Sequence, residues 1–268
     1  MNILILGDVM GPSGRKAIDQ NLPNIISKNK IDFTIINGEN AADDGKGITN
    51  SIANELFLKG VDVITSGNHI WDKQETVDYI NKEKRLLRPA NLVEGSPGNG
   101  YGIFITKNKK YKVGVINLMG NVFMRKTDDV FKVARKIKDK IKLKKNVDFI
   151  VVDFHGEITS EKMAMGHFFD GASTALVGTH THVPTADTRI LEKGTGYQTD
   201  IGMCGDYNSV IGMNKENSLK KFFKDNDAIA HFPAKGEASL SGIIVEADNT
   251  TGLTKKITRL IEGGSLIK

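Results

Sequence analysis

Six polar side chains in this chain each follow a short apolar run: Asp8, Glu39, Asn68, His155, His180 and His182. The runs are rich in β-branched residues and bounded by glycine, which is typical of buried strands. In open α/β sheets, ligands bind just beyond the carboxyl ends of the strands. We therefore expect these carboxylates, the carboxamide and the imidazoles to meet in one polar site. Such a set of side chains suits a pair of transition-metal ions.

The segment Gly178-Thr-His-Thr-His182 carries two of the imidazoles. Neutral imidazole is the commonest metal-ligand side chain, and the chain has only 6 histidines. The alternative is that these histidines only cap hydrogen bonds in a polar loop, which is the better interpretation for a single histidine. Three of them together with two carboxylates and a carboxamide favour metal binding. Oxygen and nitrogen ligands without a thiolate favour Mn or Fe, are compatible with Zn and disfavour Cu(I).

Glu39 is the carboxylate that we expect to bridge the two ions, because a shared negative charge offsets their mutual repulsion. The other ligands fall into two groups, Asp8 and His182 for one ion and Asn68, His155 and His180 for the other, and Asn40 beside Glu39 could also reach an ion. Two ions about 3.5–4 Å apart lower the pKa of a bridging water and hold the attacking and leaving oxygens of an in-line displacement. This ligand set therefore predicts the hydrolysis of a phosphoric ester.

The elements that must position these residues alternate between strand and helix in the first third of the chain. Strands are expected at 2–7, 33–38 and 61–66, with helices near 12–26, 52–59 and 73–81. This alternation predicts right-handed βαβ units on a parallel sheet. The following residues predict a hairpin at 101–106 and 112–118, a basic helix near 132–145, and strands at 148–153 and 174–178.

The C-terminal part of the chain is rich in strand patterns, at 185–191, 196–203, 239–246 and 254–261. Consecutive strands with few helices predict a second, mixed or antiparallel sheet packed on the first. The expected fold class is α/β, a two-sheet sandwich flanked by helices. Residues 1–268 are expected to form a single domain, which is large enough to fold without disulfides or metal.

The chain is mildly basic, with a net charge of +5 and an isoelectric point of about 9.0. The positive excess lies between Lys132 and Lys145, where a solvated helix face is the favoured interpretation. Contact with nucleic acid or steering of an anionic substrate is the alternative. Cys204 is the only cysteine, which suits a reducing cytoplasm. The N-terminal residues do not resemble a signal peptide and no run is long enough to cross a bilayer, so we expect a cytoplasmic protein without a membrane partner.

Several motifs resemble those of a known enzyme superfamily. Asp8, Gly67-Asn-His69, His155 and Gly178-Thr-His-Thr-His182 occur in the order and at the strand ends seen in calcineurin-like metallophosphoesterases, whose fold is an α/β/β/α sandwich. Four longer motifs are similar to the bacterial YmdB-like branch, namely Asn37-Gly-Glu-Asn40, Gly67-Asn-His-Ile-Trp-Asp72, Asp153-Phe-His-Gly-Glu157 and Gly178-Thr-His-Thr-His-Val-Pro-Thr185. The resemblance implies a di-metal phosphodiesterase that acts on cyclic nucleotides, notably 2′,3′-cyclic AMP, with a regulatory role reaching RNA turnover.

Two motifs depart from the wider superfamily. Most members have Asp-x-His on the first strand, where this chain has Asp8-Val-Met10. Most have Gly-Asp-x-x-Asp on the second strand, where this chain has Gly38-Glu-Asn40. The first metal position therefore lacks one imidazole and is expected to use Asn40 instead. Both departures match the YmdB-like branch.

His69 resembles the catalytic histidine of the family. That resemblance implies contact with a phosphate oxygen or protonation of the leaving alkoxide, a task suited to a pKa near the working pH. Asp72 lies three residues later. It either orients the His69 ring by accepting its other N–H or caps the following helix, and both interpretations stay open.

Two other functions are compatible with the same residues. One is a phosphomonoesterase that acts on a nucleoside monophosphate or a phosphoprotein. The other is a regulatory protein that binds a cyclic nucleotide or an RNA-processing partner without turnover. The complete set of metal ligands in this chain favours an enzyme over this alternative. A homo-oligomer is left open by the sequence.

Overall fold

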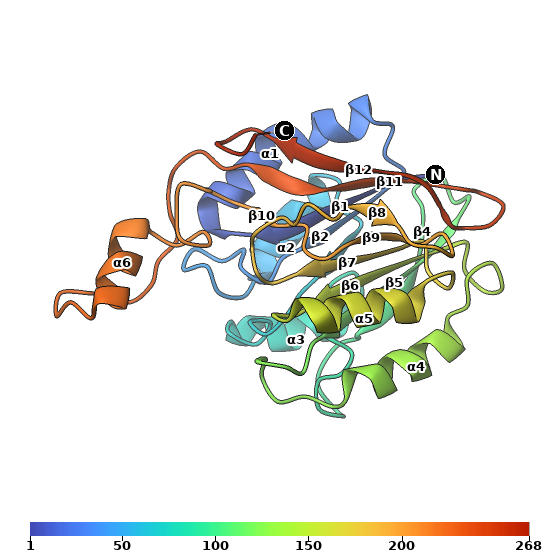
Figure 1. The fold of residues 1–268 in the computed structure, drawn as a ribbon, viewed down its shortest axis with the longest axis horizontal. Coiled ribbons are helices and arrows are strands. Elements are labelled where there is room, and N and C mark those ends of the chain that lie inside the picture. The colour runs from blue at the N-terminus through green and yellow to red at the C-terminus, as the bar shows by residue number, and fades with distance from the viewer. Residues whose placement is uncertain (268) are drawn as a thin grey trace.

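The computed structural model describes residues 1–267, which form two β-sheets packed face to face with helices on their outer sides (Figure 1). The first sheet has six strands in the order β12-β11-β1-β2-β3, with β10 beside β1. These strands are β1 (Asn2–Val9), β2 (Phe33–Asn37), β3 (Val63–Thr65), β10 (Met203–Cys204), β11 (Leu240–Ala247) and β12 (Thr254–Glu262). The strands β1, β2 and β3 are parallel, and β11 and β12 extend this sheet in antiparallel fashion.

The second sheet also has six strands, in the order β4-β5-β6-β7-β9-β8. They are β4 (Tyr101–Ile105), β5 (Lys112–Met119), β6 (Phe149–His155), β7 (Ala175–Thr179), β8 (Arg189–Ile190) and β9 (Gly196–Gln198). The strands β4 and β5 form the expected antiparallel hairpin, and β5, β6, β7 and β9 are parallel. The predicted α/β sandwich of two sheets is therefore confirmed.

Side-chain alternation along the central strands explains why the sheets are buried on both faces. In β1, Ile3 and Ile5 point into the core between the two sheets, where they meet residues such as Val151 of β6. The intervening Leu4 and Leu6 point outward and pack beneath the helices. Successive side chains of a strand face opposite sides, so a sheet covered on both faces requires the continuous apolar runs seen in the sequence.

Helices cover the outer faces of the sandwich. On the first sheet lie α1 (Gly11–Lys28), α2 (Asn50–Leu58) and α3 (Gln74–Lys82), and on the second lie α4 (Val130–Lys140) and α5 (Thr159–Phe169). A further helix, α6 (Lys215–Phe223), extends away from the sandwich (Figure 1). In α4, Ala134 and Ile137 are buried while Lys132 and Arg135 are exposed. This basic helix therefore has the solvated face that its pattern predicts.

Three details of the sequence-based expectation are wrong. The basic helix ends at Lys140 rather than near residue 145, because Ile141 adopts an extended backbone. The C-terminal strands do not form a sheet of their own: β11 and β12 extend the first sheet, and β8 and β9 extend the second. The segment 196–203 is not one strand, because the chain leaves the second sheet after Gln198 and joins the first at Met203. The helices α5 and α6 were not expected.

The topology brings several strand ends to one edge of the sandwich. In the first sheet Asp8 pairs with Asn37, and in the second sheet His155 pairs with both Met119 and Thr179. The loops that follow β1, β2, β3, β6 and β7 therefore meet where the two sheets face each other. Within residues 1–267, no helix has the length and apolar character needed to span a membrane.

Candidate metal centre

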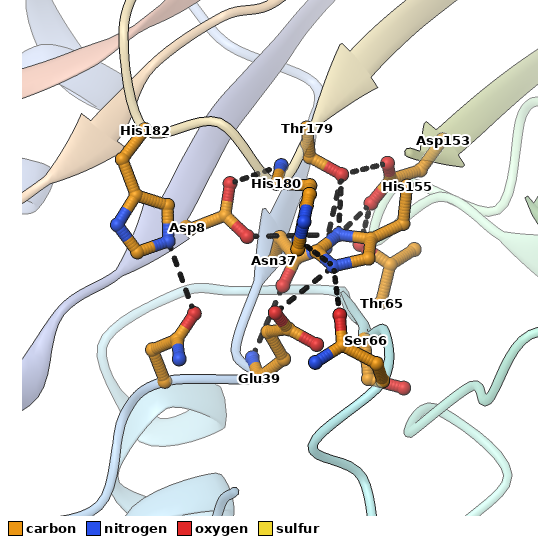
Figure 2. A network of polar contacts seen from close by, with 12 residues as sticks. Asp8, Asn37, Glu39, Thr65, Ser66, Asp153, His155, Thr179, His180 and His182 are labelled. Atoms are coloured by element: carbon orange, nitrogen blue, oxygen red, sulfur yellow. Dashed lines mark hydrogen bonds and ion pairs between the residues drawn. The ribbon is translucent and has the colours of Figure 1, made fainter. Parts of the chain in front are cut away.

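The structure brings together all seven residues that were expected to bind metal. Figure 2 labels five of them, Asp8, Glu39, His155, His180 and His182. Asp8 and His155 lie at the ends of β1 and β6, and the others lie in the loops after β2, β3 and β7, namely Glu39, Asn40, Asn68, His180 and His182. The carboxyl groups of Asp8 and Glu39 and the ring of His155 are almost completely shielded from solvent. A buried cluster of this kind is costly unless its charges are compensated.

One group of ligand atoms surrounds Nε2 of His155. This atom lies 2.9 Å from Oε1 of Glu39, 3.2 Å from Oδ1 of Asn68 and 3.1 Å from Nδ1 of His180. One ligand atom each of Glu39, His155 and His180 lie within 4.8 Å of one another, as a shared ion requires. A single proton on Nε2 can be donated to only one of these three neighbours, whereas a cation between them would interact with all four atoms.

Hydrogen bonds to the outer ring nitrogens of His155 and His180 leave the lone pairs of the other ring nitrogens directed at the shared group of ligand atoms. Nδ1 of His155 lies 2.9 Å from Oγ1 of Thr179, whose hydroxyl donates to Oδ1 of Asp153 at 2.7 Å. The Thr179 oxygen is therefore the acceptor for the Nδ1–H of His155, which leaves Nε2 free in the neutral ring. Nε2 of His180 lies 3.2 Å from the carboxylate of Glu157, which leaves Nδ1 free. Such outer hydrogen bonds fix the tautomer of metal-binding histidines.

A second group of ligand atoms lies between His182 and Asn40. Nε2 of His182 is 3.2 Å from Oδ1 of Asn40, while Nδ1 of the same ring donates to the carbonyl of Ile211 at 2.8 Å. The amide nitrogen of Asn40 donates to the carbonyl of Gly45 at 2.8 Å. Two lone pairs therefore face each other, an arrangement that is repulsive without a cation between them.

Asp8 lies next to both groups. Its Oδ2 accepts the backbone N–H of His180 at 3.1 Å, and its Oδ1 is 3.7 Å from Nδ1 of His155. Among residues 1–267, Oδ1 of Asp8 is buried without a hydrogen-bond donor. Its charge interacts with both His182 and His155. A buried carboxylate oxygen without a donor is the atom that a cation would satisfy, and the donor set therefore fits a pair of metal ions.

Gly67 allows the ligands to approach each other so closely. A Cβ atom at this position would lie 2.2 Å from Nε2 of His155 and 2.3 Å from Oε2 of Glu39. Any side chain would therefore enter the space between the ligands, so only glycine is compatible with this cluster.

The pKa values show how the cluster compensates its charges in the absence of metal. Burial opposes a charge on the His155 ring, but the attraction and hydrogen bond of Glu39, together with the charges of Asp8 and Asp153, outweigh this and raise the pKa to about 9. Burial also opposes ionisation of Glu39, yet His155 lowers its pKa to about 2. Burial raises the pKa of Asp8 to about 7, and burial together with His155 lowers the pKa of His180 to about 3. A proton on His155 thus takes the place of a shared cation.

Metal binding is expected to release more than one proton per protein near neutral pH, because His155 must deprotonate before Nε2 can bind an ion and the Asp8 carboxyl, with a pKa of about 7, is partly protonated there. The apparent affinity for Mn²⁺ should rise about tenfold per pH unit between the Asp8 pKa of about 7 and the His155 pKa of about 9, and more steeply below about pH 7. The raised pKa stabilises the metal-free fold below the unfolded value of about 6.5, and this contribution is lost as the pH rises through about 9. The gain in Tm on adding Mn²⁺ should therefore grow across this window.

Calorimetric titration in buffers of different ionisation enthalpy measures the released protons directly. A His155→Ala variant serves as the control and should release fewer protons than the wild type on exposure to Mn²⁺, because the Asp8 carboxyl, whose pKa is about 7, still has a proton to lose. An affinity for Mn²⁺ that does not change between pH 6.5 and pH 9 would contradict the assignment of the proton to His155.

A network of hydrogen bonds behind His155 holds its ring in place. The buried carboxylate of Asp153 accepts bonds from Thr179 at 2.7 Å, from Oγ1 of Thr65 at 2.5 Å and from Nδ2 of Asn37 at 3.0 Å. Sequence reasoning assigned no role to these residues. The buried role of Asp153 could have been suspected from the sequence, because this acidic residue interrupts the apolar run of β6 two residues before His155.

Replacing Thr179 by valine should weaken metal binding without unfolding the protein. Valine keeps the shape of the side chain in β7 but removes the oxygen that accepts the Nδ1–H of His155. Loss of such an outer contact lowers metal affinity about 10–100-fold. The Thr179→Ser variant retains the hydroxyl and is the matched control in a Mn²⁺ titration. Equal affinities for the valine and serine variants would show that this contact has no effect on the ligand.

His69 lies at the edge of the cluster and is more exposed than the buried ligands, with 24% of its side chain accessible. Its backbone N–H donates to Oε2 of Glu39 at 3.2 Å, and its Nδ1 lies 2.7 Å from Oδ2 of Asp72. The N-cap of α3 is Lys73, whose side chain makes no capping bond. The N-cap interpretation of Asp72 is therefore wrong, and its carboxylate instead holds Nδ1 of the His69 ring.

Comparison with known proteins agrees with this geometry. A family model described as YmdB-like protein matches residues 4–260. A Bacillus subtilis (strain 168) protein named 2′,3′-cyclic-nucleotide 2′-phosphodiesterase is 45% identical over 261 residues, which cover 97% of each chain. A Mycoplasma pneumoniae protein named putative phosphatase/phosphodiesterase is 40% identical over 272 residues and covers 98% of this chain and 94% of its own.

Solved structures show the same fold. A hypothetical protein from Thermus thermophilus superposes with a TM-score of 0.89 at 35% identity, covering 99% of this chain and 100% of its own. A protein described as a novel phosphatase from Mycoplasma pneumoniae also gives a TM-score of 0.89, at 37% identity, covering 98% of this chain and 93% of its own. A putative 5′-nucleotidase from Staphylococcus aureus has a TM-score of 0.56 at 17% identity, a likeness of fold alone.

Proposed function

This chain belongs to the YmdB-like protein family, and from that premise we propose that it is a metal-dependent phosphodiesterase that hydrolyses cyclic nucleotides, with 2′,3′-cyclic AMP favoured. The observation that carries the proposal is the buried convergence of lone pairs around Nε2 of His155, with Glu39, Asn68 and His180 as its neighbours. The named activity of the Bacillus subtilis relative, which aligns over 97% of both chains, supports the substrate class.

The metal ions are proposed to be held by two groups of ligands that share Glu39: Asp8, Asn40 and His182 in one group, and Asn68, His155 and His180 in the other. When bound, two such ions activate water as a nucleophile and neutralise charge on the phosphoryl group. Mn or Fe is proposed because oxygen and imidazole ligands dominate, and Zn remains compatible. The only cysteine, Cys204, is not among the ligands, since burial raises the pKa of its thiol to about 12.

His69 is proposed to donate the proton that the leaving alkoxide needs. The carboxylate of Asp72 accepts the Nδ1–H at 2.7 Å, which fixes one ring nitrogen and leaves Nε2 as the one that can donate. Asp72 also lies 3.4 Å from the guanidinium of Arg125. A histidine with one nitrogen fixed and the other free is suited to general acid catalysis.

A substrate panel tests the proposal. Purified protein loaded with Mn²⁺ is incubated with 2′,3′-cyclic AMP, 3′,5′-cyclic AMP, a linear diester and AMP. Cleavage of the 2′ ester bond of 2′,3′-cyclic AMP yields adenosine 3′-monophosphate, so this product should form fastest. Release of inorganic phosphate from AMP at a higher rate than diester cleavage would instead favour a phosphomonoesterase. Binding of the cyclic nucleotide without turnover would favour a regulatory protein.

A further inference from the structure

The turn that carries His180 and His182 has a backbone conformation that side chains rarely adopt. The φ angle is 99° at His180 and 65° at His182, both in the left-handed region that favours glycine. Such conformations persist only where the surrounding structure holds them in place. The position of both imidazoles therefore depends on the groups that form hydrogen bonds with this turn.

Asp200 makes these contacts from the segment that connects the two sheets. Its Oδ2 accepts the backbone N–H of Thr181 at 3.1 Å and the Thr181 hydroxyl at 2.8 Å, at the residue between the two histidines. Its Oδ1 accepts the N–H of Gly202 at 2.8 Å, and the carbonyl of Gly202 accepts the N–H of Asp8 at 3.2 Å. One carboxylate thus connects the histidine turn to the strand end that carries Asp8.

Lys162 of α5 holds this carboxylate. Its Nζ lies 2.7 Å from Oδ2 of Asp200, and both side chains are only 1% exposed. A buried ion pair rarely stabilises a fold better than apolar residues of the same size, so the pair needs another explanation. The surrounding backbone leaves room for it, because a Cβ atom at Gly178 would lie 2.8 Å from Cδ of Lys162 and 1.8 Å from the carbonyl oxygen of Thr199.

We propose that Lys162 and Asp200 are positioning residues for the metal centre. Asp200 fixes the histidine turn through Thr181, and Lys162 fixes the Asp200 carboxylate, so that both imidazoles face the metal positions. This inference rests on the proposed function, because it assumes that His180 and His182 bind metal. Neither Lys162 nor Asp200 touches the substrate in this account.

Two double variants separate the effect of the buried charges from the effect of the acceptor. K162M/D200A removes both charges and every acceptor for Thr181. K162M/D200N also removes both charges but keeps a side-chain oxygen at position 200. Because neither variant leaves an unpaired buried charge, both are expected to fold. With Mn²⁺ alone as the probe, K162M/D200A should bind about 10–100-fold more weakly than the wild type. K162M/D200N should recover only part of that loss, because its side-chain oxygen can accept from Thr181 but is no longer held by Lys162.

A control shows that the effect is not general destabilisation. Ile137→Val shortens a buried side chain of α4, on the same outer face as α5, and should lower the Tm measured in chelator without changing Mn²⁺ affinity. Mn²⁺ binding by K162M/D200A that equals the wild type in affinity and stoichiometry would overturn the positioning role. If the wild type itself bound no Mn²⁺, the proposed function would fail instead, so the two failures are distinguishable.

Discussion

Replacement of His69 by alanine is expected to lower kcat for 2′,3′-cyclic AMP by about 10²–10⁴-fold while leaving the metal content unchanged. The side chain of His69 touches Asp72 rather than any proposed ligand, and only its backbone N–H contacts Glu39. Alanine keeps that backbone contact. The loss should therefore fall on proton transfer and not on metal binding.

The leaving group distinguishes a general acid from a residue that only binds substrate. A p-nitrophenyl diester has a leaving group that needs no proton, so its hydrolysis should be much less sensitive to His69→Ala than that of the cyclic nucleotide. Metal analysis of the same preparation provides the control. Full activity toward the cyclic nucleotide, or equal losses for the two substrates, would be inconsistent with the acid role.

Replacement of Glu39 by glutamine is expected to abolish binding at both metal positions. Oε1 of Glu39 lies 2.9 Å from Nε2 of His155, and the negative charge is buried in the cluster. Loss of this charged ligand should weaken Mn²⁺ binding by more than the factor of about 10–100 that loss of a supporting contact costs. Turnover should fall by a similar factor when Mn²⁺ is limiting.

The fold should tolerate this change, because glutamine has nearly the same shape and the His155 ring, without the attraction of Glu39, can lose its proton and remain neutral. The Tm of Glu39→Gln should therefore no longer respond to added Mn²⁺, whereas ligand binding raises the wild-type Tm. The exposed Glu192 provides a matched control, since Glu192→Gln should keep the full response. Retention of two tightly bound ions in Glu39→Gln would exclude Glu39 as the shared ligand.

The positions of the proposed ligands were predictable because each depends on local pattern. Asp8 and His155 end apolar runs, and parallel strands end at the same edge of a sheet. The turn after β7 could also be anticipated, since Gly178-Thr-His-Thr-His182 follows directly on a strand. What local pattern cannot show is the strand order, so the assignment of β11 and β12 to the first sheet appears only in the structure.

The supporting contacts were not predictable because they join residues far apart in the chain. Lys162 and Asp200 are separated by 38 positions, and Asn37 and Asp153 by 116. Lys162 lies in a helix whose apolar residues do not form a clear stripe, so the sequence gives no reason to place its amine in the core. Asp72 was open to two interpretations, and the structure distinguishes them through the 2.7 Å contact with His69 and through Lys73 as the N-cap of α3.

Anomalous diffraction from crystals grown with Mn²⁺ tests the central claim most directly. The account predicts two peaks about 3.5–4 Å apart, one beside His155 and His180, the other beside Asp8 and His182, with Glu39 in contact with both. A single peak, or two peaks away from these side chains in a protein that still cleaves 2′,3′-cyclic AMP, would contradict it.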